Sequence, residues 1–294
     1  MPVDYRYHIG SLVAIFLALL LGILIGIGLA PNPQDLDQVV AGLKAEYQKV
    51  SQSNDAERKS KEAELREADA LSKETVAAVI AGRLAGKRVA MVVDHDFGRD
   101  TLPDTLRATL KQAGASVVST TVVTKDFVTL PVAVKQKVVQ QLGVYPPPGV
   151  HFRTVIAEAI AQDLARGRAD QILGLQSSGL VKSAADSNYA VRPDAVLMVG
   201  GAASPDEIAA ERIDLPLVRK LTELGVRSVG VEGKGAAISV VPLYKAAGIS
   251  TVDNADTAAG RLAIVLVLAG VSGHYGVKET ADSFLPAIPA TVQR

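Results

Sequence analysis

The stretch KRVAMVVDHDFGRDTLPDTLRATLKQAGASVVSTTVVT, residues 87–124, decides the fold of the larger part of this chain. Its first part, KRVAMVVDHDF, is an apolar run typical of a buried strand, and TLPDTLRATLKQAGA has the spacing of a helix. SVVSTTVVT is a second strand, rich in β-branched residues. A strand, a helix and a strand in this order predict a right-handed crossover between two parallel strands.

The same alternation returns later in the chain. The strands DAVLMVGGA, RSVGVEG and ISTVDN alternate with the helices LPLVRKLTELG and SVVPLYKAAG, and a last helix runs from about residue 256 to 269. We therefore predict an α/β domain over residues 86–286, with a Rossmann-like, doubly wound and mainly parallel sheet. Residues 130–182 form a mostly helical insertion in this domain, and residues 287–294 form a flexible tail.

The composition excludes several classes of protein. Lys and Arg together number 31, as do Asp and Glu, so the chain has no net basic field that would attract nucleic acid. It has no cysteine, which excludes disulfides, thiolate metal sites and cysteine nucleophiles. The methionines and histidines are few and scattered along the sequence. We predict no cofactor and no nucleic-acid partner.

Residues 9–30 are uncharged and would form a helix about 33 Å long, which matches a hydrocarbon core of about 30 Å. We predict a transmembrane helix over this range. The alternative is a secretion signal that is cut after the small residues Gly28 and Ala30. Pro31 is a poor residue to follow such a cut, and the apolar run is longer than a usual signal core. An uncleaved anchor is the interpretation that we prefer.

The few charges around this segment predict its orientation. Arg6 precedes it, whereas Asp35 is the first charge after it, so the positive-inside rule places residues 1–8 in the cytoplasm. The bulk of the chain would then be extracytoplasmic, in a single-pass protein of the cell membrane that contacts lipid. Gly22 and Gly26 have a spacing that lets two membrane helices approach closely, although glycine is also common in spans that do not associate.

Residues 34–83 are charged, free of proline and rich in helix formers. Leu36, Val39 and Leu43 follow the 3-4 spacing of a coiled coil, but the phase is lost through SQSND. Pairs of opposite charge four residues apart would support an exposed helix. We predict a long, coiled-coil-like stalk through which the chain forms a homo-oligomer. The alternative is a helix folded back on the α/β domain.

In an open parallel sheet, ligands bind beyond the carboxyl ends of the strands. The predicted strand ends carry residues that would line a ligand crevice: Asp94, Asp96, Gly200, Gly201, Glu232 and Asp253. Strand ends in any such fold also collect Gly and Asp for turns and helix caps, so both readings stay open. Asp94, His95 and Asp96 have the residue types of a cation site, but a cap or a turn explains this triplet better, and we predict no metal ligand.

No pattern of catalytic residues is visible. GVEGKG lacks the spacing of the dinucleotide fingerprint, and the sequence has no phosphate loop. We find neither a Ser-His-Asp arrangement nor paired carboxylates whose spacing would place them across a substrate. We therefore predict no catalytic residue and a protein that is not an enzyme. An α/β enzyme or ligand receptor that uses the strand-end crevice is our third hypothesis.

Both ends of the chain resemble one known family. The opening YRYHIGSLVAIFLALLLGILIGIGL, the charged helix after it and the closing HYGVKETADSFLP together resemble the bacterial copper transport outer-membrane protein family of the MctB type. The likeness follows the order of elements over nearly the whole chain. It implies a role in copper homeostasis or in copper transport across the cell envelope. The outer-membrane location in the family label is not supported by the sequence pattern.

The resemblance leads to two further functional hypotheses. The first is a non-enzymatic envelope protein that handles copper, although copper(I) prefers sulfur and imidazole ligands and the sequence shows no evident site for the ion. The same family includes actinobacterial proteins that act in cell separation with a cytoplasmic partner and cell-wall hydrolases. The second hypothesis is therefore a coiled-coil scaffold that links a cytoplasmic partner to cell-wall machinery.

Overall fold

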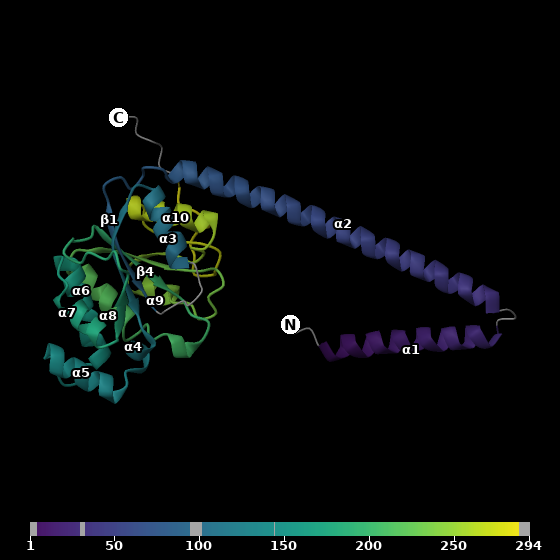
Figure 1. The fold of residues 1–294 in the computed structure, drawn as a ribbon, viewed down its shortest axis with the longest axis horizontal. Coiled ribbons are helices and arrows are strands. Elements are labelled where there is room, and N and C mark those ends of the chain that lie inside the picture. Colours follow the sequence, from purple (N-terminus) through teal and green to yellow (C-terminus); the bar gives the residue numbers. More distant parts are fainter. Residues whose placement is uncertain (1–4, 30–32, 95–101, 144, 288–294) are drawn as a thin grey trace. The chain divides into compact units, whose positions relative to one another are not determined.

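A computed structural model describes residues 5–29, 33–94, 102–143 and 145–287 of the chain. The chain divides into two compact units, Met1–Ala68 and Asp69–Arg294. The first unit holds helix α1 (Tyr5–Leu29) and most of helix α2 (Pro33–Ile80). The second unit holds the end of α2 and an α/β domain (Figure 1).

Helix α1 corrects the prediction of a membrane span. Over the described part of the chain, no helix has both the length and the apolar character that crossing a membrane requires. The transmembrane helix predicted at residues 9–30 is therefore not found among the described residues. A Cβ atom added at Gly22 or Gly26 would meet no atom within 4 Å other than the backbone of its own helix. No described residue therefore packs against these two glycines.

Helix α2 is one continuous helix of 48 residues, but it is not the predicted coiled coil. Its side chains Leu43 and Leu65 are each 70% exposed, and no described helix packs over them. A coiled coil is not formed because clear heptad spacing lasts for only about two heptads. Beyond them, most residues on the surface of the helix are charged or polar. Leu36 and Val39 belong to α2, but their side chains lie outside what the structure describes.

Among the described residues of the second unit, seven strands form one sheet. They are β1 (Arg88–Val93), β2 (Ser116–Val123), β3 (Val181–Ser183), β4 (Ala195–Gly200), β5 (Arg227–Glu232), β6 (Ser250–Val252) and β7 (His274–Tyr275). Their spatial order is β3-β2-β1-β4-β5-β6-β7. All neighbours are parallel except β2 and β3. The α/β class is what we predicted, and the sheet is mixed because its edge strand β3 is antiparallel.

Helices cover both faces of this sheet (Figure 1). One face carries α4 (Lys125–Thr129), α5 (Val132–Leu142), α6 (Phe152–Arg166), α7 (Asp170–Ser177), α8 (Asp214–Glu223) and α9 (Val241–Ala246). The other face carries α3 (Leu102–Gln112), α10 (Ala258–Ala269) and the end of α2. A short 3-10 helix, η1 (Pro205–Glu207), follows β4. The domain therefore has three layers, with the sheet in the middle.

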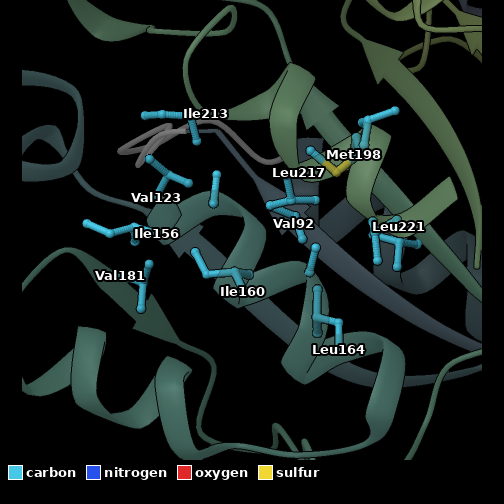
Figure 2. Close-up of a cluster of buried hydrophobic side chains, with 14 of the residues drawn as sticks. Val92, Val123, Ile156, Ile160, Leu164, Val181, Met198, Ile213, Leu217 and Leu221 are labelled. Carbon is cyan, nitrogen blue, oxygen red and sulfur yellow. The ribbon is translucent and has the colours of Figure 1, made fainter. Parts of the chain in front are cut away.

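Each face of the sheet has its own hydrophobic core. Ala90 and Val92 of β1 belong to the core under α6 and α8, whereas Met91 belongs to the core under α3 and α10. Successive side chains of a strand point to opposite faces, so a strand covered on both faces is apolar throughout. Figure 2 shows the first core, where Val92 and Met198 of the sheet lie beside Leu217 of α8.

The strand order places a topological switch point between β1 and β4. From β1 the chain moves first to β2 on one side and later to β4 on the other side. In open α/β sheets, ligands bind at the carboxyl ends of the two strands that border such a point. The carboxyl ends of β1 and β4 are therefore the natural place to look for a site.

Candidate functional site

The predicted crevice residues lie along the carboxyl edge of the sheet, but the acidic ones are buried. Asp94 follows β1, Glu232 ends β5 and Asp253 follows β6, and their exposed fractions are 2%, 0% and 1%. Asp96 lies outside the described residues. The three described carboxyl groups are thus enclosed by the protein, and the chemistry of each depends on the groups that it contacts.

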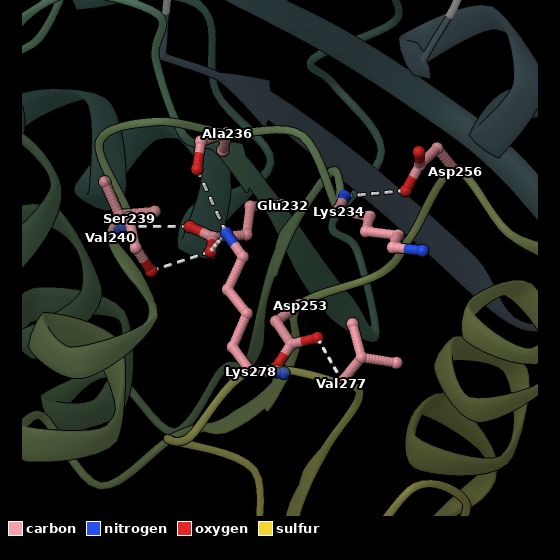
Figure 3. A network of polar contacts seen from close by, with 9 residues as sticks. All are labelled: Glu232, Lys234, Ala236, Ser239, Val240, Asp253, Asp256, Val277 and Lys278. Atoms are coloured by element: carbon pink, nitrogen blue, oxygen red, sulfur yellow. Dashed lines mark hydrogen bonds and ion pairs between the residues drawn. The ribbon is translucent and has the colours of Figure 1, made fainter. Parts of the chain in front are cut away.

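Glu232 lies at the centre of a group of polar contacts in which both of its carboxylate oxygens have partners (Figure 3). Its Oε1 accepts a hydrogen bond from the hydroxyl of Ser239 at 2.7 Å and pairs with the Nζ of Lys278 at 2.5 Å. Its Oε2 accepts from the backbone N–H of Val240 at 2.8 Å. The same ammonium group donates to the carbonyl oxygen of Ala236 at 3.3 Å. The buried charge of Glu232 is therefore compensated, and the network ties β5 to the loop before α9.

Asp253 holds the segment that follows β7. Its Oδ1 accepts from the backbone N–H of Val277 at 2.7 Å, and its Oδ2 accepts from that of Lys278 at 2.9 Å. These bonds position Lys278 so that its side chain reaches Glu232 (Figure 3). Asp253 and Glu232 thus both bind the segment after β7, and these contacts hold that segment against the carboxyl ends of β5 and β6.

Asp94 has a different partner, which lies far away in the sequence. It forms a carboxyl pair with Asp214 at the start of α8, and Asp214 is 1% exposed. The hydroxyl of Tyr244 from α9 donates to Oδ2 of Asp94 at 3.4 Å. Oδ1 of Asp94 and Oδ2 of Asp214 have no hydrogen-bond donor among the described groups. A proton shared between the two carboxyl groups would supply the missing donor.

The pKa values of this cluster agree with a shared proton. Burial raises the pKa of Asp94 well above its usual range, and the charge of Asp214 and the hydrogen bond that Asp94 donates to it raise this pKa further. Burial raises the pKa of Asp214 to about 7, against the opposing effect of the same hydrogen bond. Burial, and then the nearby acidic groups of Asp214, Asp94 and Glu232, also raise the pKa of Tyr244. Asp94 therefore carries the proton and Tyr244 stays a neutral donor.

Gly200 and Gly201 make room for the two acidic groups. A Cβ atom at Gly200 would overlap the carboxyl of Asp94 and would lie 3.0 Å from the hydroxyl oxygen of Tyr244. Gly201 has a φ of +88°, and a Cβ atom there would lie 3.1 Å from the Cβ of Glu232. The switch point between β1 and β4 is therefore filled by side chains of the protein itself.

Sequence reasoning did not find Asp214, Tyr244 or Lys278, and it found no paired carboxylates. Asp214 opens a helix, where an acidic residue is ordinarily a favourable neighbour of the helix N-terminus. In the sequence, Tyr244 fits the pattern of the apolar residues on the buried face of a helix. Lys278 lies in HYGVKETADSFLP, a stretch whose sequence signal is its resemblance to a family. Only the tertiary fold brings these residues together, and nothing in their spacing signals it.

A groove opens beside this cluster. Its volume is about 1070 Å³, and it lies between α4, the start of α6, the segment from η1 to α8, and α9. Ser239 and Val240, which hold Glu232, also form part of its wall. Lys125, Arg153 and Arg212 are its basic residues. Sequence reasoning did not predict this groove, because its residues come from segments far apart in the chain.

The described residues contain no metal-binding cluster. No three histidine, aspartate or glutamate side chains within the described ranges gather closely enough to hold an ion. Met91 and Met198 are both fully buried, and they belong to the cores on opposite faces of the sheet. His95 of the predicted triplet lies outside the described residues.

Comparison with known proteins places the chain in a family. Residues 3–286 match the family model described as "Copper transport outer membrane protein, MctB". Proteins named "Copper transporter MctB" from Mycobacterium tuberculosis and Mycobacterium bovis are each 25% identical to this chain over 319 aligned positions. The alignment covers 96% of this chain and 98% of each relative. The resemblance noted in the sequence is therefore confirmed, and the chain belongs to the MctB family of copper transport outer membrane proteins.

Proposed function

We propose that this protein takes part in the transport of copper across the cell envelope and so in copper homeostasis. The observation that carries the proposal is the family match, which runs from residue 3 to residue 286 and so includes both units of the structure. The mycobacterial relatives that bear the name of copper transporter align over 96% of the chain. Copper is cargo in this proposal, not a resident cofactor.

We further propose that the α/β domain is not an enzyme. Paired carboxyl groups of raised pKa are common in catalytic sites, so Asp94 and Asp214 would be the first candidates for acid-base chemistry. Both side chains are almost completely buried, and each faces the other. The carboxylate oxygens of Glu232 and Asp253 all accept hydrogen bonds from groups of the protein itself. This use of the acidic residues supports a structural role for them.

The proposal is tested in a deletion strain of the source organism. We expect deletion to change both the copper concentration that inhibits growth and the copper content of the cells measured by mass spectrometry. Inhibition by zinc, measured in parallel, is the control for a general defect of the envelope. Plasmid-borne wild-type protein should restore both copper readouts. Unchanged copper tolerance and copper content in the deletion strain would contradict the proposal.

The scaffold hypothesis stays a prediction. Copurification from membranes followed by mass spectrometry would identify a cytoplasmic or cell-wall partner. Recovery of such a partner with the wild-type protein, together with unchanged copper handling in the deletion strain, would favour the scaffold over transport.

A further inference from the structure

The groove beside α9 has the size and the lining of a small-molecule site. Its volume of about 1070 Å³ lies slightly above the usual range for ligand pockets, which ends at about 1,000 Å³. Apolar side chains form much of its wall, and they are Val128, Ile208, Ile238, Val240, Pro242 and Leu243. Such a wall would accept an apolar chain or ring of a ligand.

Three cations lie in the same groove, and they have few partners. The side chains of Lys125 and Arg212 are exposed and make no hydrogen bond or ion pair with any described residue. Arg153 donates from Nε to the carbonyl of Phe127 at 3.1 Å and from Nη2 to that of Thr129 at 2.9 Å. Its Nη1 has no partner in the described part of the chain, so it can donate to a ligand.

The positive charge of the groove is not neutralised from within. Arg212 lies close enough to Arg153 that its charge, after the effect of burial, lowers the pKa of Arg153. Among the described lining residues, Glu211 is the acidic one against these three cations. Two guanidinium groups that line one groove present several N–H donors in planar forks, which match the oxygen atoms of a carboxylate or a phosphate.

From these contacts we propose that the groove binds a small amphiphilic anion, an oxyanion carried on an apolar chain or ring. The oxyanion would lie between Arg153 and Arg212, and the apolar part would lie along Val128, Leu243 and Ile208. A phosphate monoester and a carboxylate share this chemistry. The proposal concerns a site for an organic anion and does not depend on the role in copper transport.

The test is isothermal titration calorimetry on the full-length protein with four probes. Phenyl phosphate and benzoate carry both features of the ligand, benzyl alcohol lacks the charge, and inorganic phosphate lacks the ring. We expect saturable binding of phenyl phosphate or benzoate, and the stronger of the two identifies the preferred oxyanion. Binding of benzyl alcohol should be weaker by roughly tenfold or more, since a hydrogen bond to a charged group is worth about that factor. Inorganic phosphate should also bind more weakly, because it has no ring to bury against the apolar wall.

Variants then assign the site. Arg212→Gln is the main variant because its side chain makes no contact that the fold requires, and it should weaken binding by roughly tenfold. Arg168→Gln removes an exposed arginine outside the groove and should leave binding unchanged. Arg153→Gln should also weaken binding, and its circular dichroism spectrum reports whether the overall fold is kept.

Three results would overturn the proposal. The first is that neither anionic aromatic probe binds at millimolar concentration. The second is that benzyl alcohol binds as well as the anions, and the third is that Arg212→Gln and Arg168→Gln have the same affinity as the wild type. None of these results bears on copper tolerance, so a failure here and a failure of the transport proposal can be told apart.

Discussion

Two groups of acidic residues lie at the carboxyl edge of the same sheet, and they differ in the partners that surround their carboxyl groups. Glu232 is held by Lys278, by a hydroxyl group and by a backbone N–H, so it is buried as a compensated anion. Asp94 has no ion pair with any residue that the structure describes, and it faces Asp214. It is therefore buried as a neutral acid that donates to the other carboxyl group.

This difference shows that position in the fold does not decide the charge of a residue. Both Asp94 and Glu232 stand at the end of a buried parallel strand, where burial alone disfavours a charge. A single nearby ammonium group makes the anion acceptable in one case. In the other case a second carboxyl group makes the anion still less favourable. Substitutions at the two places should thus have different sizes and different dependences on pH.

The largest effect should come from Glu232→Ala. The change leaves Lys278 without its buried partner and leaves the donors of Ser239 and Val240 unsatisfied, so we expect a loss of about 3–5 kcal/mol in the free energy of unfolding. Urea denaturation followed by near-ultraviolet circular dichroism measures it. Glu223→Ala is the matched control, because Glu223 makes an exposed ion pair with Lys220, and it should have little effect. Equal losses in the two variants would mean that the network around Glu232 does not stabilise the fold.

A smaller and pH-dependent effect is expected for Asp94→Asn. The folded pKa of Asp94 is raised, so the folded state binds more protons than the unfolded state, and the stability of the wild type falls as pH rises above about 4. The variant lacks this loss, so its stability relative to the wild type should improve between pH 5 and pH 8, by at most about 1.4 kcal/mol per pH unit. Asp104→Asn on α3 controls for the loss of one exposed aspartate. A stability difference that stays constant with pH would contradict a protonated Asp94.

The smallest effect should come from Tyr244→Phe. The hydroxyl donates one long hydrogen bond, 3.4 Å, to Asp94. We expect its loss to lower the free energy of unfolding by about 1 kcal/mol or less. Because that bond lowers the pKa of Asp94, the variant should hold the proton of Asp94 to higher pH. A loss as large as that of Glu232→Ala would show that Tyr244 has a role beyond this contact.

Much of the α/β domain could be predicted from the sequence. The strands β1, β2, β4, β5 and β6 lie within the apolar runs that we had assigned to strands, because burial on both faces makes such runs continuous. The edge strands β3 and β7 have three and two residues, too few for any period, and they are defined by their pairing alone. The predictions of a membrane span and of a coiled coil were wrong. Apolar content and short heptad runs are properties of one segment, and they do not determine which other part of the protein packs against that segment.

The candidate site was much harder to predict than the fold. The described residues at the strand ends lie along one edge, since parallel strands bring their carboxyl ends together, and a ligand crevice at that edge stays a prediction. Their partners were not predictable, because Asp214 and Lys278 reach the edge from a helix start and from the segment after β7. The residue that decides the charge of each acidic group is distant in sequence, and spacing carries no signal for it.

The most direct test of the difference between the two acidic groups is a titration of the aspartate carboxyl carbons by nuclear magnetic resonance, from pH 4 to pH 8. Asp94→Asn and Asp214→Asn assign the two signals. We predict that the signal of Asp214 titrates with a midpoint of about 7, and that Asp94 is still protonated at that pH. Midpoints near the ordinary aspartate value of about 4 for both groups would contradict the shared proton.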